Sequence, residues 1–319
     1  MPADMIDSTA FSPSVNGRPI RWAAATGLWH FEGTKASYLG PAADSPHPYG
    51  IALSDRDLTD GSVQIGIKLS SPNVSAGVIL GFQSERSRYI VAQLGAYERA
   101  YTVTEFVPGL GWRGIELVGL AKNLEAGREY EVELRKIGQE IRMTVDGVRV
   151  IESILAEPLG GRQLGLLAFG PATVDFSELQ VHSASPRVFV AMQFGAPFDT
   201  LYQEVIYPLV KEQLGLSLIR MDEVAGPGIV FEDMKRQLAE AQIVIAEITA
   251  PNQNVFYELG YAHALNKPTI LMAQRGKELP FDIRSYRVIF YDDSIGGKPA
   301  LERSLRKHLE AILGEAQSA

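Results

Sequence analysis

The chain of 319 residues contains no cysteine. Disulfide bonds, thiolate nucleophiles and thiolate-bound metal ions are therefore excluded from its chemistry. A protein without cysteine suits a reducing compartment, and we expect this one in the cytoplasm.

Histidine is scarce as well, and its positions are scattered. No HxH or HxxxH spacing places two imidazoles on one metal ion, so no metal site is predicted. The five residues are His30, His47, His182, His263 and His308.

Long apolar runs are missing. None approaches the roughly 20 residues that cross a bilayer, so no membrane contact is expected. The first residues, MPADMIDSTAFSP, lack a basic segment followed by an apolar one, and we expect no signal peptide. Residues 1–15 are predicted to form a mobile leader.

An excess of basic charge is also missing. The net charge is −8, and acidic residues outnumber basic ones in both halves, so no nucleic-acid partner is expected. Residues 186–319 contain neither GxGxxG nor GxxxxGK[ST], which leaves dinucleotide-binding and P-loop mechanisms without support.

The first half is rich in short β-prone runs punctuated by turn residues, which predicts an antiparallel β-sandwich over residues 16–184. Asp146-Gly147 between two such runs predicts a tight hairpin. Examples of the predicted strands are Tyr49–Leu53, Ser62–Leu69, Ala76–Phe82, Tyr89–Leu94, Tyr101–Val107, Tyr130–Ile137, Ile141–Val145, Val148–Ile151 and Leu164–Ala168.

Several motifs of this half, GVILGF, EYEVELRKIGQEIRMTVDGVRV and GLLAFGPATVDFSELQV, resemble the concanavalin A-like lectin/glucanase sandwich. The resemblance implies a jelly-roll fold, and its members bind glycans, hydrolyse them or bind protein. Hydrolysis is not expected, because Glu98, Glu105 and Glu116 form no carboxylate pair on one strand. The sequence leaves open whether the three tryptophans stack on sugars or pack in the core. They are Trp22, Trp29 and Trp112.

At Pro186 the pattern changes to strands alternating with helices, which predicts a doubly wound, five-stranded parallel sheet over residues 186–319. A kink is expected at Pro208, inside a helix over Thr200–Leu214. The other predicted elements are strands Val188–Met192, Leu216–Met221, Ile243–Ile248 and Val288–Tyr291, and helices Ile229–Ala241 and Pro299–Leu313.

The central stretch is IVIAEITAPNQNVFYELGYAHALNKPTILM, a buried strand, a polar turn, a helix and a second strand. Glu258 falls in or just after the first turn of this helix, facing the crevice where open α/β sheets bind ligands. We expect the helix dipole to hold its carboxylate ionised, and we predict that it is the reactive residue.

Other polar and aromatic residues follow the strand ends, where they meet a ligand in such sheets. Asn252 and Asn254 serve equally well as helix caps, and Phe198 as core. Arg284 and Arg287 are candidates to pair with a diphosphate. The predicted substrate-binding residues are Gln193, Phe194, Phe198, Asp199, Arg220, Asp222, Thr249, Asn252, Asn254 and Tyr257.

RVFVAMQFGAPFDTLY, the central stretch and PFDIRSYRVIFY together resemble the TIR-like nucleotide-binding family, which is related to nucleoside 2-deoxyribosyltransferases and prokaryotic TIR domains. The resemblance implies a flavodoxin-like sheet with a nucleotide at its carboxyl edge. Its functional Glu, in a motif N-x-FYELG, falls on Glu258. It further implies cleavage of the nicotinamide–ribose bond of NAD, an anti-phage role and a homo-oligomer regulated through the sandwich.

Two alternatives stay open for the second half. AMQFG at the end of the first strand differs from the Ser-rich or Tyr-Ser end that this strand has in TIR signalling domains, and it favours a deoxyribosyltransferase-like enzyme acting on nucleosides. A non-catalytic module that binds a nucleotide signal is the other. NAD enters as substrate and no cofactor is expected. Nicotinamide leaves as a neutral base without an acid, although Glu247 or Asp222 remain candidates for one. The ligand that triggers the sandwich is left open between a glycan, a protein and a small molecule.

Overall fold

The computed structural model describes residues 20–32, 35–43, 47–84, 86–223, 230–279, 283 and 285–318. The chain divides into two compact units, Met1–Leu155 with Leu159–Ala184, and Ala156–Pro158 with Ser185–Ala319. The predicted leader, residues 1–15, lies outside the described residues.

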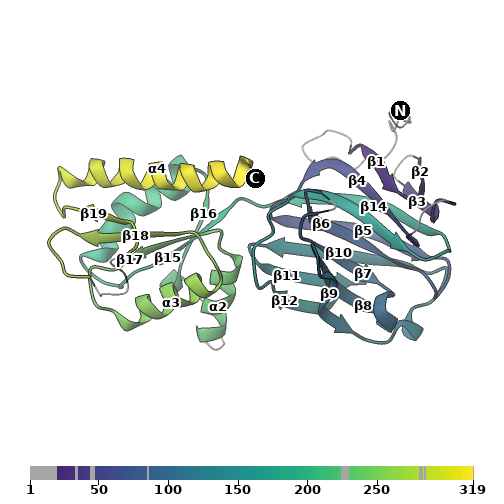
Figure 1. Ribbon diagram of the computed structural model, residues 1–319. Coiled ribbons are helices and arrows are strands. Elements are labelled where there is room, and N and C mark those ends of the chain that lie inside the picture. The colour runs from purple at the N-terminus through teal and green to yellow at the C-terminus, as the bar shows by residue number, and fades with distance from the viewer. Residues whose placement is uncertain are drawn as a thin grey trace. The chain divides into compact units, whose positions relative to one another are not determined.

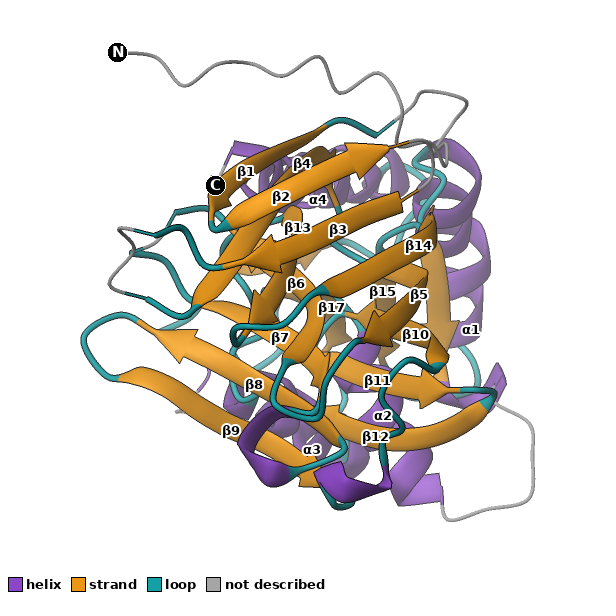
Figure 2. Cartoon of the chain, turned by 90° about the vertical axis from the view of Figure 1, so that its right-hand side faces the viewer, coloured by secondary structure: helices purple, strands orange, loops and turns teal. Residues whose placement is uncertain are grey.

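The first unit consists of two seven-stranded antiparallel sheets that form a jelly-roll sandwich (Figure 1, Figure 2). One sheet has the order β1-β4-β13-β6-β7-β8-β9 and the other β12-β11-β10-β5-β14-β3-β2. The strands are β1 (Trp22–Thr26), β2 (Leu28–Glu32), β3 (Lys35–Gly40), β4 (Tyr49–Asp57), β5 (Gly61–Leu69), β6 (Ser75–Phe82), β7 (Tyr89–Leu94), β8 (Tyr101–Val107), β9 (Gly111–Val118), β10 (Glu129–Ile137), β11 (Glu140–Val145), β12 (Val148–Ile154), β13 (Gln163–Phe169) and β14 (Val174–Ser183).

Alternation of apolar side chains builds the core between these sheets. On β5, Val63, Ile65 and Ile67 are buried while the intervening residues are partly exposed, as expected of a strand with one covered face. The predicted hairpin at Asp146-Gly147 is confirmed: it joins β11 to β12, and both residues have the positive φ that this turn requires, 49° and 76°.

The second unit contains a five-stranded, all-parallel sheet, as predicted, and its strand order is β16-β15-β17-β18-β19. Its strands are β15 (Arg187–Ala191), β16 (Ser217–Arg220), β17 (Ile243–Glu247), β18 (Thr269–Gln274) and β19 (Val288–Tyr291). Because all five run in one direction, their carboxyl ends meet at one edge of the sheet.

Helices cover both faces of this sheet (Figure 1). The helix formed by α1 (Phe198–Leu201), η3 (Tyr202–Ile206) and η4 (Pro208–Gln213) packs with α4 (Gly297–Ser318) on one face. α2 (Val230–Glu240) and α3 (Gln253–Ala264) pack on the other. Around Pro208, which has no N–H to donate, the helix widens to a π-helical pattern.

Candidate functional site

A cavity of about 310 Å³ opens at the carboxyl edge of the parallel sheet, on the face covered by α2 and α3. Met192 and Phe194 line it from the end of β15, and Met221 from the end of β16. The two helices supply the remaining lining residues, Phe231, Met234, Asn252, Asn254, Val255, Tyr257 and Glu258.

Glu258 contributes the one carboxylate among the described residues that line this cavity. Burial raises the pKa of this carboxyl from 4.5 to about 7. The expectation that the helix dipole holds it ionised was therefore wrong. Glu258 is the sixth residue of α3, and the dipole acts mainly within the first turn, so desolvation prevails.

Asn252 is the N-cap of α3. Its Oδ1 accepts hydrogen bonds from the backbone N–H groups of Asn254, at 2.9 Å, and Val255, at 3.4 Å. The predicted role of Asn252 as a helix cap is thus confirmed, and the residue also lines the cavity. Asn254 does not cap, and its side chain is an exposed part of the cavity wall.

Aromatic rings form much of the wall. Tyr257, 53% exposed, lies with its ring centroid 5.7 Å from that of Phe231, which is 41% exposed. Phe194 lies exposed on the loop after β15.

Sequence reasoning missed five lining residues. Met192 and Met221 directly follow strands, and that position is a signal that could have found them. Phe231 and Met234 are three positions apart on α2 and therefore share one helix face, and Val255 lies in the first turn of α3.

Arg220, at the end of β16, is only 6% exposed and does not line the cavity. Its guanidinium lies 4.2 Å from the ring centroid of Tyr202 and donates to Asp199 at 2.9 Å and to Asp222. Both carboxylates thus neutralise it. The structure brings these three predicted residues together beside the cavity as an ion-pair cluster that ties α1 to the end of β16.

Thr249 and Phe198 belong to the opposite face of the sheet. The Thr249 hydroxyl donates to the carboxylate of Glu247, which also accepts from Tyr291 Oη at 3.0 Å. Glu247 is 1% exposed, and burial raises its pKa, partly offset by these hydrogen bonds. Phe198 packs in the apolar core on the face of the sheet that α4 covers. Neither Thr249 nor Phe198 is brought to the cavity, and Glu247 is not an acid for it.

The remaining predicted residues lie elsewhere. Gln193 is partly buried and is not among the cavity's lining residues. Arg287 precedes β19 and is therefore at the amino edge of the sheet, across from the carboxyl edge where it was expected to meet a diphosphate. Arg284 lies outside the described residues.

No group of three or more metal-ligating side chains occurs in the described part of the chain. None of the helices in those same ranges is both long enough and apolar enough to cross a membrane.

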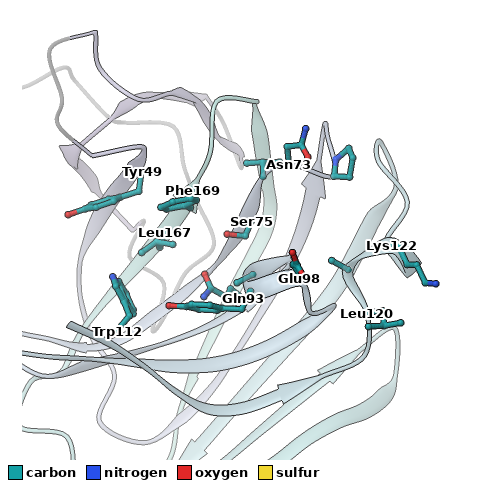
Figure 3. Close-up of a pocket in the computed structure, with 16 residues that line it drawn as sticks. Tyr49, Asn73, Ser75, Gln93, Glu98, Trp112, Leu120, Lys122, Leu167 and Phe169 are labelled. Carbon is teal, nitrogen blue, oxygen red and sulfur yellow. The ribbon is translucent and has the colours of Figure 1, made fainter. Parts of the chain in front are cut away.

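The sandwich carries a larger cavity, of about 730 Å³, over one end of the sheet that contains β4, β13, β6 and β7 (Figure 3). Tyr49, Trp112 and Phe169 contribute aromatic walls, and Gln93 contributes a buried carboxamide. Glu98 and Lys122 bring one charge of each sign, as Figure 3 shows.

The structure separates the three tryptophans. Trp22 is buried in the core, Trp29 packs against it, and Trp112 is exposed in the cavity wall. Of the acids considered for hydrolysis, Glu105 is buried between Arg88 Nε, at 2.6 Å, and Arg113. Its carboxylate is thus engaged in ion pairs rather than paired with a second acid.

No family model and no curated protein matches the chain. Among solved structures, the sandwich half is similar to the carbohydrate-binding module CBM66 from Bacillus subtilis, at 15% identity over 51% of this chain and 95% of that one, with a TM-score of 0.42. A prokaryotic β-1,3-1,4-glucanase (lichenase) derived from a mouse hindgut metagenome has 13% identity over 51% and 93%, with a TM-score of 0.39. The galectin LEC-6 of Caenorhabditis elegans has 14% identity over 46% and 95%, with a TM-score of 0.33. Because these TM-scores are all below 0.5, the jelly-roll fold of the sandwich is assigned from its own strand order.

Proposed function

We propose that the parallel-sheet domain is an N-glycosidase that releases nicotinamide from NAD, with Glu258 as its catalytic carboxylate. The observation that carries this proposal is the composition of the cavity at the carboxyl edge. Among its described lining residues, three aromatic rings and three methionines surround one acid and no base. A planar, cationic ring such as the nicotinamide of NAD suits such walls, because aromatic faces attract cations.

The reaction proceeds by breaking the bond between C1′ of the ribose and the nicotinamide nitrogen. The bonding electron pair leaves with the nitrogen, so that nicotinamide departs neutral and needs no proton. The Glu258 carboxylate stabilises the oxocarbenium-like ribose or captures it covalently. Water then adds at C1′ and loses a proton, giving ADP-ribose.

Glu258 needs to be ionised for this role. Burial alone places its pKa at about 7. A cationic nicotinamide ring beside it favours the charged form and lowers that pKa, so substrate binding prepares the carboxylate.

A nucleoside is the second candidate substrate, and one observation favours it. No Lys or Arg is among the described residues that line the cavity, so nothing in its wall matches the diphosphate of NAD. The nearby Arg220 is already neutralised by Asp199 and Asp222. In this alternative, Glu258 transfers or hydrolyses the sugar of a neutral nucleoside. If no base is released, the domain is instead a non-catalytic module that binds a nucleotide.

For the sandwich we propose a ligand-binding role in its larger cavity, with a neutral glycan as the trigger. The exposed Trp112 and Phe169 offer flat apolar surfaces, and Gln93 offers hydrogen bonds to hydroxyl groups. We further propose that this ligand controls the NADase and that the chain self-associates. The proposal also includes a cytoplasmic location and a role in anti-phage defence.

The test is an incubation of the full chain with NAD and, separately, with purine and pyrimidine nucleosides. Release of nicotinamide, lost in Glu258→Gln, supports the NADase. Release or exchange of nucleoside bases without action on NAD supports the second candidate. Absence of both, with the chain folded and concentrated, contradicts an N-glycosidase of either kind.

A further inference from the structure

β19 is the outermost strand of the parallel sheet. β18 pairs with one of its edges, and none of the described strands pairs with the other. Its sequence, VIFY, is apolar and β-prone and contains no Pro or Lys. Exposed edge strands usually contain Pro or Lys, which prevent pairing with another chain. The free edge of β19 is thus open to a further strand.

The direction of the backbone groups fixes which residues such a strand meets. The C=O of Tyr291 accepts from the N–H of Arg275, the residue that directly follows β18, at 2.8 Å. Successive residues of a strand point their backbone groups to opposite sides, so Ile289 and Tyr291 face β18. Val288 and Phe290 therefore direct their N–H and C=O groups outward.

A cavity lies next to β19. It has a volume of about 360 Å³, and it is lined by residues 288–292, which include all of β19, and by residues of α4. The α4 residues in its wall include Gly297, Ala300 and Ser304, whose short side chains leave room next to the strand. Phe290 on β19 is 44% exposed, a large apolar side chain without full cover.

Charges at the two ends of β19 are opposite. Arg287 precedes the strand, Asp293 follows it by two residues, and both are exposed. Neither has an ion-pair partner within the described ranges. Consider a second β19 laid antiparallel to the first, with Phe290 opposite Phe290. Each residue that precedes Phe290 in one copy then lies opposite the residue that follows Phe290 by the same number of positions in the other copy. Arg287 of each copy then faces Asp293 of the other.

We propose that the free edge of β19 is a self-association surface, on which a second copy of this chain adds its own β19 about a two-fold axis. Two parallel sheets become one continuous sheet of ten strands. Val288 and Phe290 exchange backbone hydrogen bonds with the partner, and two reciprocal Arg287–Asp293 pairs select the register. The proposal is independent of the activity proposed for Glu258. Because the strand is short, we expect a weak dimer, with a Kd on the order of micromolar to sub-millimolar.

Sedimentation velocity of the full chain, over concentrations up to about 0.2 mM, tests the proposal. Arg287→Glu places two acids together at both ends of the paired strands, and Asp293→Arg places two arginines together. Each variant alone should weaken the dimer by about tenfold or more, since attraction becomes repulsion at two sites. Lys211→Glu, an exposed charge reversal on η4, should leave the dimer unchanged.

Mixing the two variants distinguishes this register from others. At one end of the mixed dimer, the acid introduced by Arg287→Glu in one copy meets the base introduced by Asp293→Arg in its partner. At the other end, the native Asp293 of the first copy meets the native Arg287 of the second. An equimolar mixture of Arg287→Glu and Asp293→Arg should therefore recover the wild-type dimer affinity.

Three results would overturn the proposal. They are a chain that stays monomeric at about 0.2 mM, an assembly indifferent to both reversals, and a mixture as weak as its components. If a peptide with the sequence of residues 285–294 binds the chain but the chain does not dimerise, the edge takes a foreign strand instead.

Discussion

Burial of Glu258 makes the stability of the parallel-sheet domain dependent on pH. The pKa of this carboxyl is about 7 in the folded cavity against 4.5 ordinarily, so between these values the folded state holds a proton that the unfolded state has lost. Stability from this group is fully present below pH 4.5 and is lost as pH rises through 7. Glu258→Gln removes the ionisation and should abolish this loss.

The magnitude follows from the difference between the two pKa values, which corresponds to at most about 3 kcal/mol. Water at the cavity mouth screens part of this penalty. We therefore expect Glu258→Gln to stabilise the domain by about 1–3 kcal/mol at pH 8 and by less than about 0.5 kcal/mol at pH 4.5.

The chain provides its own internal reference for this measurement. All three tryptophans lie in the sandwich, so their fluorescence in a denaturant titration reports the sandwich alone. The helical component of the far-UV circular dichroism comes mainly from the parallel-sheet domain, which contains helices α1 to α4. The substitution should shift the dichroism transition at pH 8 and leave the fluorescence transition in place.

Glu212→Gln supplies the matched control, because Glu212 is an exposed carboxylate on η4 of the same domain. It should change stability by less than about 0.5 kcal/mol at either pH. A Glu258→Gln variant that is destabilised at pH 8, or that shows the same gain at both pH values, would refute the claim that Glu258 is held in a desolvated cavity.

Three further predictions concern the same cavity. Asn252→Ala removes the cap of α3 and should destabilise the domain by about 1 kcal/mol, as measured by the dichroism transition. Cleavage of NAD should show a kcat/KM that rises with pH around a midpoint near 7, the pKa of Glu258 in the free enzyme; a profile flat across that range contradicts a catalytic carboxylate there. Phe231→Ala should raise the KM for NAD by about tenfold, while its exposure keeps the loss of stability below about 1 kcal/mol; an unchanged KM would exclude the ring from the binding wall.

The architecture was largely predictable because its two halves carry different periodicities. The parallel strands are short apolar runs, and β15, β17 and β19 lie where those runs predicted them. β1, β2, β3, β9 and β14 are not among the strands named from the sequence. β1 and β9, WAAAT and GWRGIELV, alternate only weakly, because they are the two edge strands of one sheet and much of each face is exposed.

The candidate site was predictable only in part. Glu258, Asn252, Asn254 and Tyr257 fall on one helix after one strand, so local spacing brought them together. Thr249 was misplaced because a residue at a strand end can face either side of the sheet, and strand alternation directed it away from α3 together with Glu247.

The electrostatic state of the site was beyond local sequence patterns. The sequence predicts Asp199, Arg220 and Asp222 as separate substrate-binding residues, whereas in the structure they form ion pairs with one another. The pKa of Glu258 depends on how much apolar surface from β15, β16 and α2 surrounds it, and that is set by tertiary packing.

The most direct test of the central claim is the rate of nicotinamide release from NAD by the full chain, compared with Glu258→Gln and Glu212→Gln at matched folded concentrations. The proposed role of Glu258 predicts at least about a 1,000-fold loss for Glu258→Gln and none for Glu212→Gln. Release by Glu258→Gln at a rate close to that of the wild type would contradict it.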